Sequence, residues 1–258
     1  MASDAPALVL AVPGAGADPG AELAERVAES AAESCPGVDI RIGYLGGDAD
    51  LLAELLAPEA LAASAGPDGW QQPQAVVVPL LAGPHPVFDA IIGEIVSRAP
   101  QAVMLATALG PHPLLAGALH DRLSEVGLAR ASRARGLNIA SGANGVIVVA
   151  DRGPQAISDA GVTTVLLAAR LAIPALPASF GDPASVSEAL QRLRDAGASH
   201  PAIAPCVIGL ETDPAEIIAL SEMLRAPCAA PLGTHPAVAQ LVAVRYGEAL
   251  ARISVPAR

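Results

Sequence analysis

The sequence predicts an α/β fold made of two half-domains, each a mostly parallel sheet flanked by helices. Short apolar runs rich in β-formers recur along the chain without polar alternation. Such runs are typical of strands buried on both faces of a parallel sheet. Helical segments with clear start and stop signals lie between the runs, and alternation of strand and helix implies right-handed crossover connections.

The predicted strands are spread over the whole chain. They are ALVLAV from Ala7, VDIRIGYL from Val38, AVVVPLL from Ala75, AVMLATAL from Ala102, GVIVVA from Gly145, PALPASF from Pro174, PAIAPCVIGL from Pro201 and APCAAPLG from Ala226.

Two of the predicted helices have recognisable start or stop signals. In SVSEALQRLRDAG, Ser185 and Glu188 form a capping box and Gly197 is the stop signal. In DPAEIIALSEMLR, Asp213 is the predicted cap and Glu216 is expected to face back toward the helix start.

The two halves of the chain repeat each other. An old duplication leaves matches whose spacing drifts by a few residues in the loops. We therefore predict an N-terminal half over 1–135, a linker over 136–143 and a C-terminal half over 144–258. The matching pairs are LGPHPLLAGALHDRL from Leu109 with LGTHPAVAQLVAVRY from Leu232, VPLLAGPH from Val78 with APCVIGLE from Ala204, and LGGDADLLAELL from Leu45 with FGDPASVSEAL from Phe180.

The composition excludes several classes of function. The net charge of -11 argues against a nucleic-acid partner, because phosphate binding needs clustered basic side chains. The three cysteines, Cys35, Cys206 and Cys228, form no CxxC pair, so neither a disulfide framework nor a cysteine zinc site is expected. We therefore expect a cytoplasmic protein.

No apolar run has the form of a signal peptide or a membrane span. The N-terminal run carries Asp4 where a signal peptide carries basic residues. The run GVTTVLLAARLAIPALPASF is interrupted by Arg170, Pro174 and Pro177. No membrane partner is predicted.

Five motifs follow one another along the chain: VPLLAGPHPVFD, LGPHPLL, VSEALQRLRDAGA, IAPCVIGLE, and PLGTHP followed by RYGEAL. Their order resembles that of the sirohydrochlorin cobalt/ferrochelatases, or class II chelatases, in their long and internally duplicated form. The resemblance runs over nearly the whole chain and implies flavodoxin-like half-domains. It implies insertion of Co(II) or Fe(II) into a tetrapyrrole, in siroheme or cobalamin biosynthesis, with no organic cofactor.

The resemblance also implies where the site lies. The family places one histidine in a loop after the first strand and another in a Gly-x-His turn after the third. The second corresponds to His85, preceded by Gly83, and Asp89 stands at the family's following aspartate position. At the first position this chain has Gly14, and Gly46 replaces a nearby family glutamate.

In the second half, Asp151 stands at the position of the loop histidine and Glu211 at the position of His85. We take His85 as catalytic, as proton acceptor and metal ligand, because imidazole accepts protons near neutral pH and binds late first-row divalent ions. The other expected metal ligands are Asp89 and Glu211. Arg152 is expected to bind the substrate's carboxylates, with Gly14 and Gly83 also lining the substrate site.

The remaining polar candidates favour scaffold roles. His112 and His235 stand at equivalent repeat positions, each before a helix, which predicts helix-end hydrogen bonds. His120 and His200 are expected to be solvated. Asp18 and Asp151 are expected to cap helices.

A nucleotide site is not expected in the loop 14–20. GAGADPG joins a strand to a helix, but it lacks the GxGxxG pattern and a P-loop lysine.

Two functions remain open. The first is a lyase that inserts the divalent metal into sirohydrochlorin or a related tetrapyrrole, with that macrocycle and the metal as its partners. The second is a catalytically degenerate homologue that binds a tetrapyrrole or metal as a carrier or partner protein, which the residues at Gly14 and Gly46 favour. Because duplication supplies both halves in one chain, we expect a monomer or a weak homodimer.

Overall fold

The computed structural model describes residues 5–16, 20–46, 51–57, 73–130, 142–153 and 155–253. The chain divides into two compact units. The first comprises Met1–Leu81, Pro86–Leu109 and Val238–Arg258, and the second comprises Ala82–His85 and Gly110–Ala237. Within the described residues, no helix is long and apolar enough to cross a membrane.

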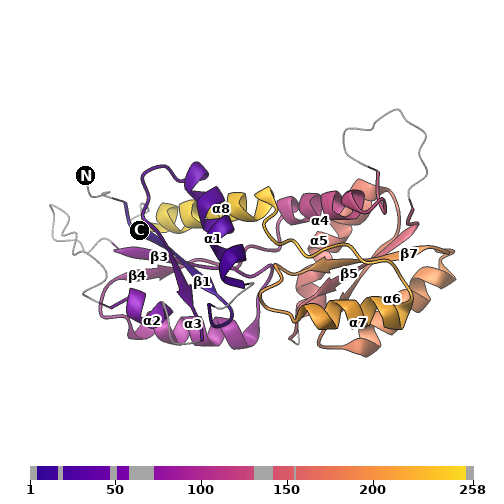
Figure 1. Cartoon of the computed structure of the whole chain (residues 1–258), viewed down its shortest axis with the longest axis horizontal. Helices are drawn as coiled ribbons and strands as arrows, with labels where there is room; N and C mark the ends of the chain where they lie inside the picture. Colours follow the sequence, from indigo (N-terminus) through magenta and orange to yellow (C-terminus); the bar gives the residue numbers. More distant parts are fainter. Residues whose placement is uncertain are drawn as a thin grey trace. The chain divides into compact units, whose positions relative to one another are not determined.

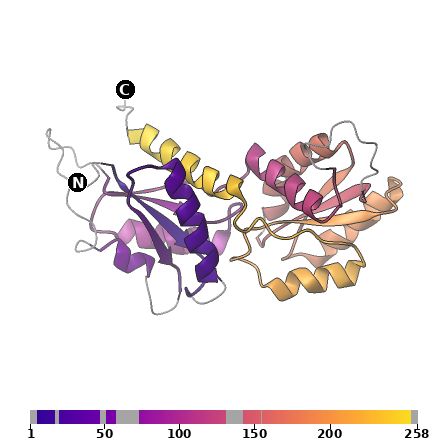
Figure 2. The ribbon, with the colours of Figure 1, turned by 45° about the horizontal axis from the view of Figure 1, so that its top comes forward.

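The first unit is built on a parallel sheet in the order β2-β1-β3-β4. Its helices cover both faces, with α1 and α8 on one side and α2 and α3 on the other (Figure 1, Figure 2). The elements are β1 (Ala7–Val12), α1 (Gly20–Ser34), β2 (Ile40–Tyr44), α2 (Leu52–Leu55), β3 (Ala75–Pro79), α3 (Pro86–Arg98), β4 (Val103–Leu105) and α8 (Pro236–Ile253).

The central strands of this unit are buried on both faces, as their unbroken apolar sequences predict. Every residue of β1 and β3 is buried. Val9 and Val77 face a cluster completed by Ile92 of α3 and by Leu52 and Leu56 from α2 and its end. Covering helices on both sides thus explain why these strands carry no polar alternation.

The second unit repeats this arrangement around the parallel order β6-β5-β7. Helices α4 and α5 lie on one side of the sheet, and α6 and α7 lie on the other (Figure 1). The elements are α4 (Pro113–Glu125), β5 (Gly145–Ala150), α5 (Ala156–Leu171), β6 (Ala175–Ser179), α6 (Pro183–Asp195), β7 (Pro201–Cys206) and α7 (Pro214–Leu224).

The strand predicted from Ala226 is shortened to a single bridge. Cys228 pairs with Ile203 in parallel, at the position that β4 holds in the first unit. The neighbouring Pro227 and Pro231 have no N–H to donate, so the ladder cannot extend. The second unit therefore has the same strand order as the first, with its fourth strand reduced to one bridge.

The ends of α6 and α7 differ in part from the prediction. The cap of α6 is Asp182, which accepts from the N–H groups of Ala184 and Ser185, so the capping box at Ser185 and Glu188 is wrong. Asp182 is the cap instead of Ser185 because Pro183 occupies the first helical position, where no helical hydrogen bond needs its missing N–H. The stop at Gly197 is confirmed by its positive φ of 92°.

At α7, the predicted cap is confirmed because Asp213 accepts from the N–H of Ala215. Glu216 does not face back toward the helix start. Its carboxylate pairs with Arg152 instead.

The compact units do not follow the predicted ranges 1–135 and 144–258. Helix α4 belongs to the second unit, where it packs against α5 and β7, and most of α8 belongs to the first. Most of the predicted linker 136–143 lies outside the described residues. The α/β class itself, with two helix-covered parallel sheets, is confirmed.

Candidate functional site

The polar side chains of the second unit gather where its strands end. Asp151 directly follows β5, and Thr212 lies in the loop after β7. The segment Ala82–His85, which follows β3, belongs to the same compact unit. Because the carboxyl ends of parallel strands meet at one edge of a sheet, ligands of α/β proteins bind there. This edge brings His85 together with Asp151 and Thr212.

His85 and Asp151 form the centre of the cluster. The His85 Nε2 lies 3.3 Å from the Asp151 Oδ2, and the two side chains are 9% and 13% exposed. The other carboxylate oxygen, Oδ1, accepts a hydrogen bond from the Thr212 hydroxyl at 3.1 Å. The expected capping role of Asp151 is wrong, because α5 begins after Gln155 and no side chain caps it.

The Asp151 carboxyl is enclosed. Its Oδ2 is buried and accepts no hydrogen bond from any described residue. Burial raises the pKa of this carboxyl above its ordinary value, and the opposing effects of His85 and the Thr212 hydroxyl only reduce the shift. The site therefore holds a carboxylate with one satisfied and one unsatisfied oxygen.

The segment that carries His85 is held against a glycine. A Cβ at Gly110 would lie 2.3 Å from the Ala82 carbonyl oxygen and 2.5 Å from the Leu115 Cδ1. Such contacts are too short for any side chain, so only glycine fits. Gly83 has open space around it, and the whole His85 residue, backbone included, is 7% exposed.

Glu211 holds its own loop. Its Oε1 accepts from the N–H of Ile208 at 2.7 Å, and its Oε2 accepts from those of Gly209 and Leu210 at 2.9 and 3.0 Å. Burial raises the pKa of this carboxyl, and the charge of Asp151 raises it further, while the backbone donors act in the opposite direction. Glu211 is therefore a loop anchor that lies close enough to Asp151 for their charges to interact.

Arg152 is exposed and engaged with a carboxylate of its own unit. Its guanidinium donates to both carboxylate oxygens of Glu216, from the start of α7. The ion pair ties the loop after β5 to α7 and leaves the outer face of Arg152 in solvent, with 45% of the side chain exposed.

Gly14 and Asp89 lie in the first unit. Gly14 has a φ of 100°, in the left-handed region that glycine occupies at no steric cost, and its carbonyl oxygen accepts from the N–H of Gly46 at 2.9 Å. Asp89 lies in the first turn of α3. Within the described parts of the chain, no three His, Cys, Asp or Glu side chains converge to hold a metal ion, and Asp89 lies in a different compact unit from His85 and Glu211.

The scaffold role of two histidines is confirmed. The Nδ1 of His112 accepts from the backbone N–H two residues on at 3.1 Å, and that of His235 does the same at 3.2 Å. His200 is exposed, as expected. His120 is buried instead of solvated, with its Nδ1 3.2 Å from Asp121, because its face of α4 packs into the unit. The predicted cap Asp18 lies outside the described residues.

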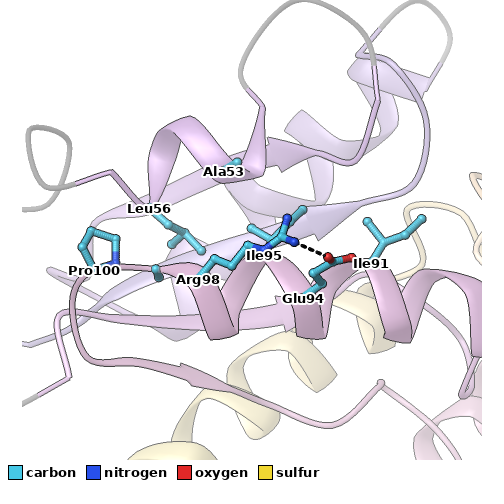
Figure 3. A pocket seen from close by; sticks show the side chains of 8 residues that line it. Ala53, Leu56, Ile91, Glu94, Ile95, Arg98 and Pro100 are labelled. Carbon is cyan, nitrogen blue, oxygen red and sulfur yellow. Dashed lines mark ion pairs between the residues drawn. The ribbon is translucent and has the colours of Figure 1, made fainter.

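A separate pocket of about 220 Å³ lies between α2 and α3 in the first unit (Figure 3). It is lined mainly by aliphatic side chains, among them Leu56, Ile91 and Ile95. At its rim, Arg98 and Glu94 form an ion pair at 2.7 Å. The pocket brings no acid, base or nucleophile toward a ligand, since its two charged groups neutralise each other.

Sequence reasoning missed Thr212 and the pairing of Asp151 with His85. A signal was present, because Asp151 follows β5 and Thr212 follows β7, and these are neighbouring strands. No spacing in the sequence indicates that His85, which lies in the other half of the sequence, is close to Asp151.

The comparison with solved structures concerns this fold, two helix-covered parallel units of this strand order. Two solved structures share it over nearly their whole length. The structure of SirB from Bacillus subtilis with Fe3+ matches with a TM-score of 0.70 and 19% identity, covering 96% of this chain and 97% of that one. The sirohydrochlorin chelatase SirB from Bacillus subtilis subspecies spizizenii, in complex with cobalt, matches with a TM-score of 0.67 and 15% identity over the same shares.

No protein-family model and no curated protein sequence matches this chain. The fold that the resemblance predicted is thus confirmed by structure, at identities where sequence comparison finds nothing.

Proposed function

We propose that this protein is a chelatase that inserts Co(II) or Fe(II) into sirohydrochlorin or a related tetrapyrrole. The observation that carries the proposal is the position of His85, enclosed at the carboxyl edge of a parallel sheet beside Asp151. The shared fold supports it, because both similar structures are of SirB, one with Fe3+ and one, named as a sirohydrochlorin chelatase, in complex with cobalt.

The reaction exchanges two protons for one metal ion. Two pyrrole N–H bonds break, four metal–nitrogen bonds form, and both protons leave. The His85 imidazole can accept a proton and bind the incoming ion. Metal and protons compete for the same nitrogen, so uptake of the ion weakens in acid.

The substrate is a macrocycle with many carboxylates. In an acidic protein, its binding needs local guanidinium groups. The exposed face of Arg152 provides one, and Gly83 has open space for close approach of a ring. We assign these two residues to substrate binding, with Gly14 from the first unit, and we place the enzyme in the cytoplasm as a monomer or weak homodimer.

A second candidate is a carrier that binds a tetrapyrrole or metal without turnover. The glycine at position 14 favours it, because glycine has no side chain that could accept the second proton at that position. The two candidates differ in turnover and not in binding.

An absorbance assay separates them. Anaerobic sirohydrochlorin is mixed with Co(II) or Fe(II), and the spectral shift of the metallated ring is followed for the wild type, His85→Ala and the control His200→Ala. The enzyme predicts a rate above the spontaneous one that H85A loses and H200A keeps. No acceleration by the wild type excludes the enzyme, and tetrapyrrole binding without acceleration identifies the carrier.

A further inference from the structure

The distance between His85 and Asp151 is long for a charge-assisted hydrogen bond. Charge-assisted bonds between nitrogen and carboxylate are about 2.7–2.9 Å long. Here the Nε2 and Oδ2 atoms are 3.3 Å apart, and the buried Oδ2 accepts no hydrogen bond from the described residues. A buried carboxylate oxygen left in this state is costly unless another ligand satisfies it.

The same distance suits two ligands of one ion. Imidazole nitrogen and carboxylate oxygen each bind a first-row divalent metal at about 2.0–2.2 Å. Two such bonds that meet at an angle between 90° and the tetrahedral value place the donor atoms about 2.8–3.6 Å apart. The observed 3.3 Å lies inside this range.

Asp151 is held in place for such a role. The Thr212 hydroxyl fixes Oδ1 at 3.1 Å, which orients the carboxylate and leaves Oδ2 toward His85. The Ser179 hydroxyl donates to the Asp151 backbone carbonyl, which fixes the main chain at the same point. Outer hydrogen bonds of this kind orient metal ligands.

The surrounding charge favours a cation. The Glu211 carboxylate lies close enough to act on Asp151 electrostatically. The positive charge of the nearby Arg152 is matched by Glu216. His85 and Arg152 both act on Asp151 electrostatically, and a divalent ion bound beside His85 would add further positive charge opposite the two buried carboxyl groups.

We propose that Asp151 is the second protein ligand of the metal substrate, which it holds together with His85 before transfer to the tetrapyrrole. The proposal rests on the proposed function for the identity of the metal and its destination. One imidazole and one carboxylate leave the other coordination positions to water and then to ring nitrogens. On transfer, the bonds from the metal to Nε2 and Oδ2 break as its bonds to the ring nitrogens form.

Binding of Co(II) to the protein alone tests this assignment. Titration calorimetry and the visible absorption of bound Co(II) are measured without tetrapyrrole for the wild type, Asp151→Asn and His85→Ala. The matched control is Asp195→Asn, a surface carboxylate that bonds only Gln191 among the groups described. We expect D151N and H85A each to weaken Co(II) binding about tenfold or more, and D195N to leave it unchanged.

A second variant separates lost ligation from lost folding. Asp151→His restores a donor atom at the same place and should bind Co(II) more tightly than D151N, with a changed absorption spectrum. Wild-type affinity in D151N, or no Co(II) binding by the wild type, overturns the assignment. If D151N binds Co(II) normally while the wild type metallates sirohydrochlorin, the ligand assignment fails and the chelatase stands. If Asp151 binds Co(II) and the wild type metallates nothing, the assignment stands and the chelatase fails.

Discussion

Replacing Gly110 by alanine should displace the segment that carries His85. The new methyl carbon would lie 2.3 Å from the Ala82 carbonyl oxygen, where an ordinary contact is at least 3.4 Å, so one group must move by about 1 Å. The carbonyl belongs to the backbone and cannot rotate away, and the other neighbour, Leu115, is fully buried. Overpacking of this kind costs about 1–3 kcal/mol.

The measurement is urea unfolding together with Co(II) binding. G110A should lower the free energy of unfolding by about 1–3 kcal/mol with an unchanged m-value. It should also weaken Co(II) binding, because His85 follows Ala82 by only three residues.

The matched control is Gly117→Ala in α4, where an added Cβ meets nothing within 4 Å. That variant should gain about 0.5–1 kcal/mol, since alanine favours the helix over glycine, and it should bind Co(II) as the wild type does. Equal stability and equal Co(II) affinity of G110A and the wild type would refute the close seating of this segment.

Three further changes test the scaffold and the substrate site. Arg152→Ala should lower the free energy of unfolding by less than about 1 kcal/mol, because its pair with Glu216 is exposed. The same variant should weaken tetrapyrrole binding in an absorbance titration, and unchanged binding would exclude Arg152 from the substrate site. Burial, aided by the charge of Arg122, lowers the pKa of His235 below its ordinary value, so the folded state prefers the neutral ring and loses stability as pH falls from the ordinary histidine pKa toward that lowered pKa. His235→Asn should therefore lose less stability on acidification from about pH 7.5 to about pH 5 than the wild type, as urea midpoints will show; an equal loss contradicts the assignment. Asp182→Ala should lower the free energy of unfolding by about 1 kcal/mol through loss of the α6 cap, and no change would mean that the cap bonds are not formed in solution.

Much of the fold could be predicted because a strand that is buried on both faces has an unbroken run of apolar residues. The unbroken apolar runs at β1, β3, β5 and β7 each became a fully buried strand. The errors occurred where a local sequence pattern is compatible with two helix starts. Ser185 and Asp182 both begin a plausible helix, and Pro183 decided between them.

The candidate site could be predicted only in part. His85 followed from its place after an apolar strand and from the family resemblance. Its partner did not, because Asp151 lies in the other half of the sequence and the approach depends on which unit the segment 82–85 joins. The prediction that His120 is solvated was wrong for the same reason, because the sequence of one helical turn does not indicate which of its faces other elements will cover.

The assignment of α4 and α8 to the units has a consequence for how the chain can be divided. The backbone passes from one unit to the other after Leu81, His85, Leu109 and Ala237. A break between the sequence repeats would leave the first unit without the Tyr246 hydroxyl that donates to Pro6 O at 2.6 Å and without the Arg245 guanidinium that donates to Ala108 O at 2.9 Å. Neither predicted repeat therefore contains all the parts of one compact unit, so cutting the chain between the repeats leaves both fragments incomplete.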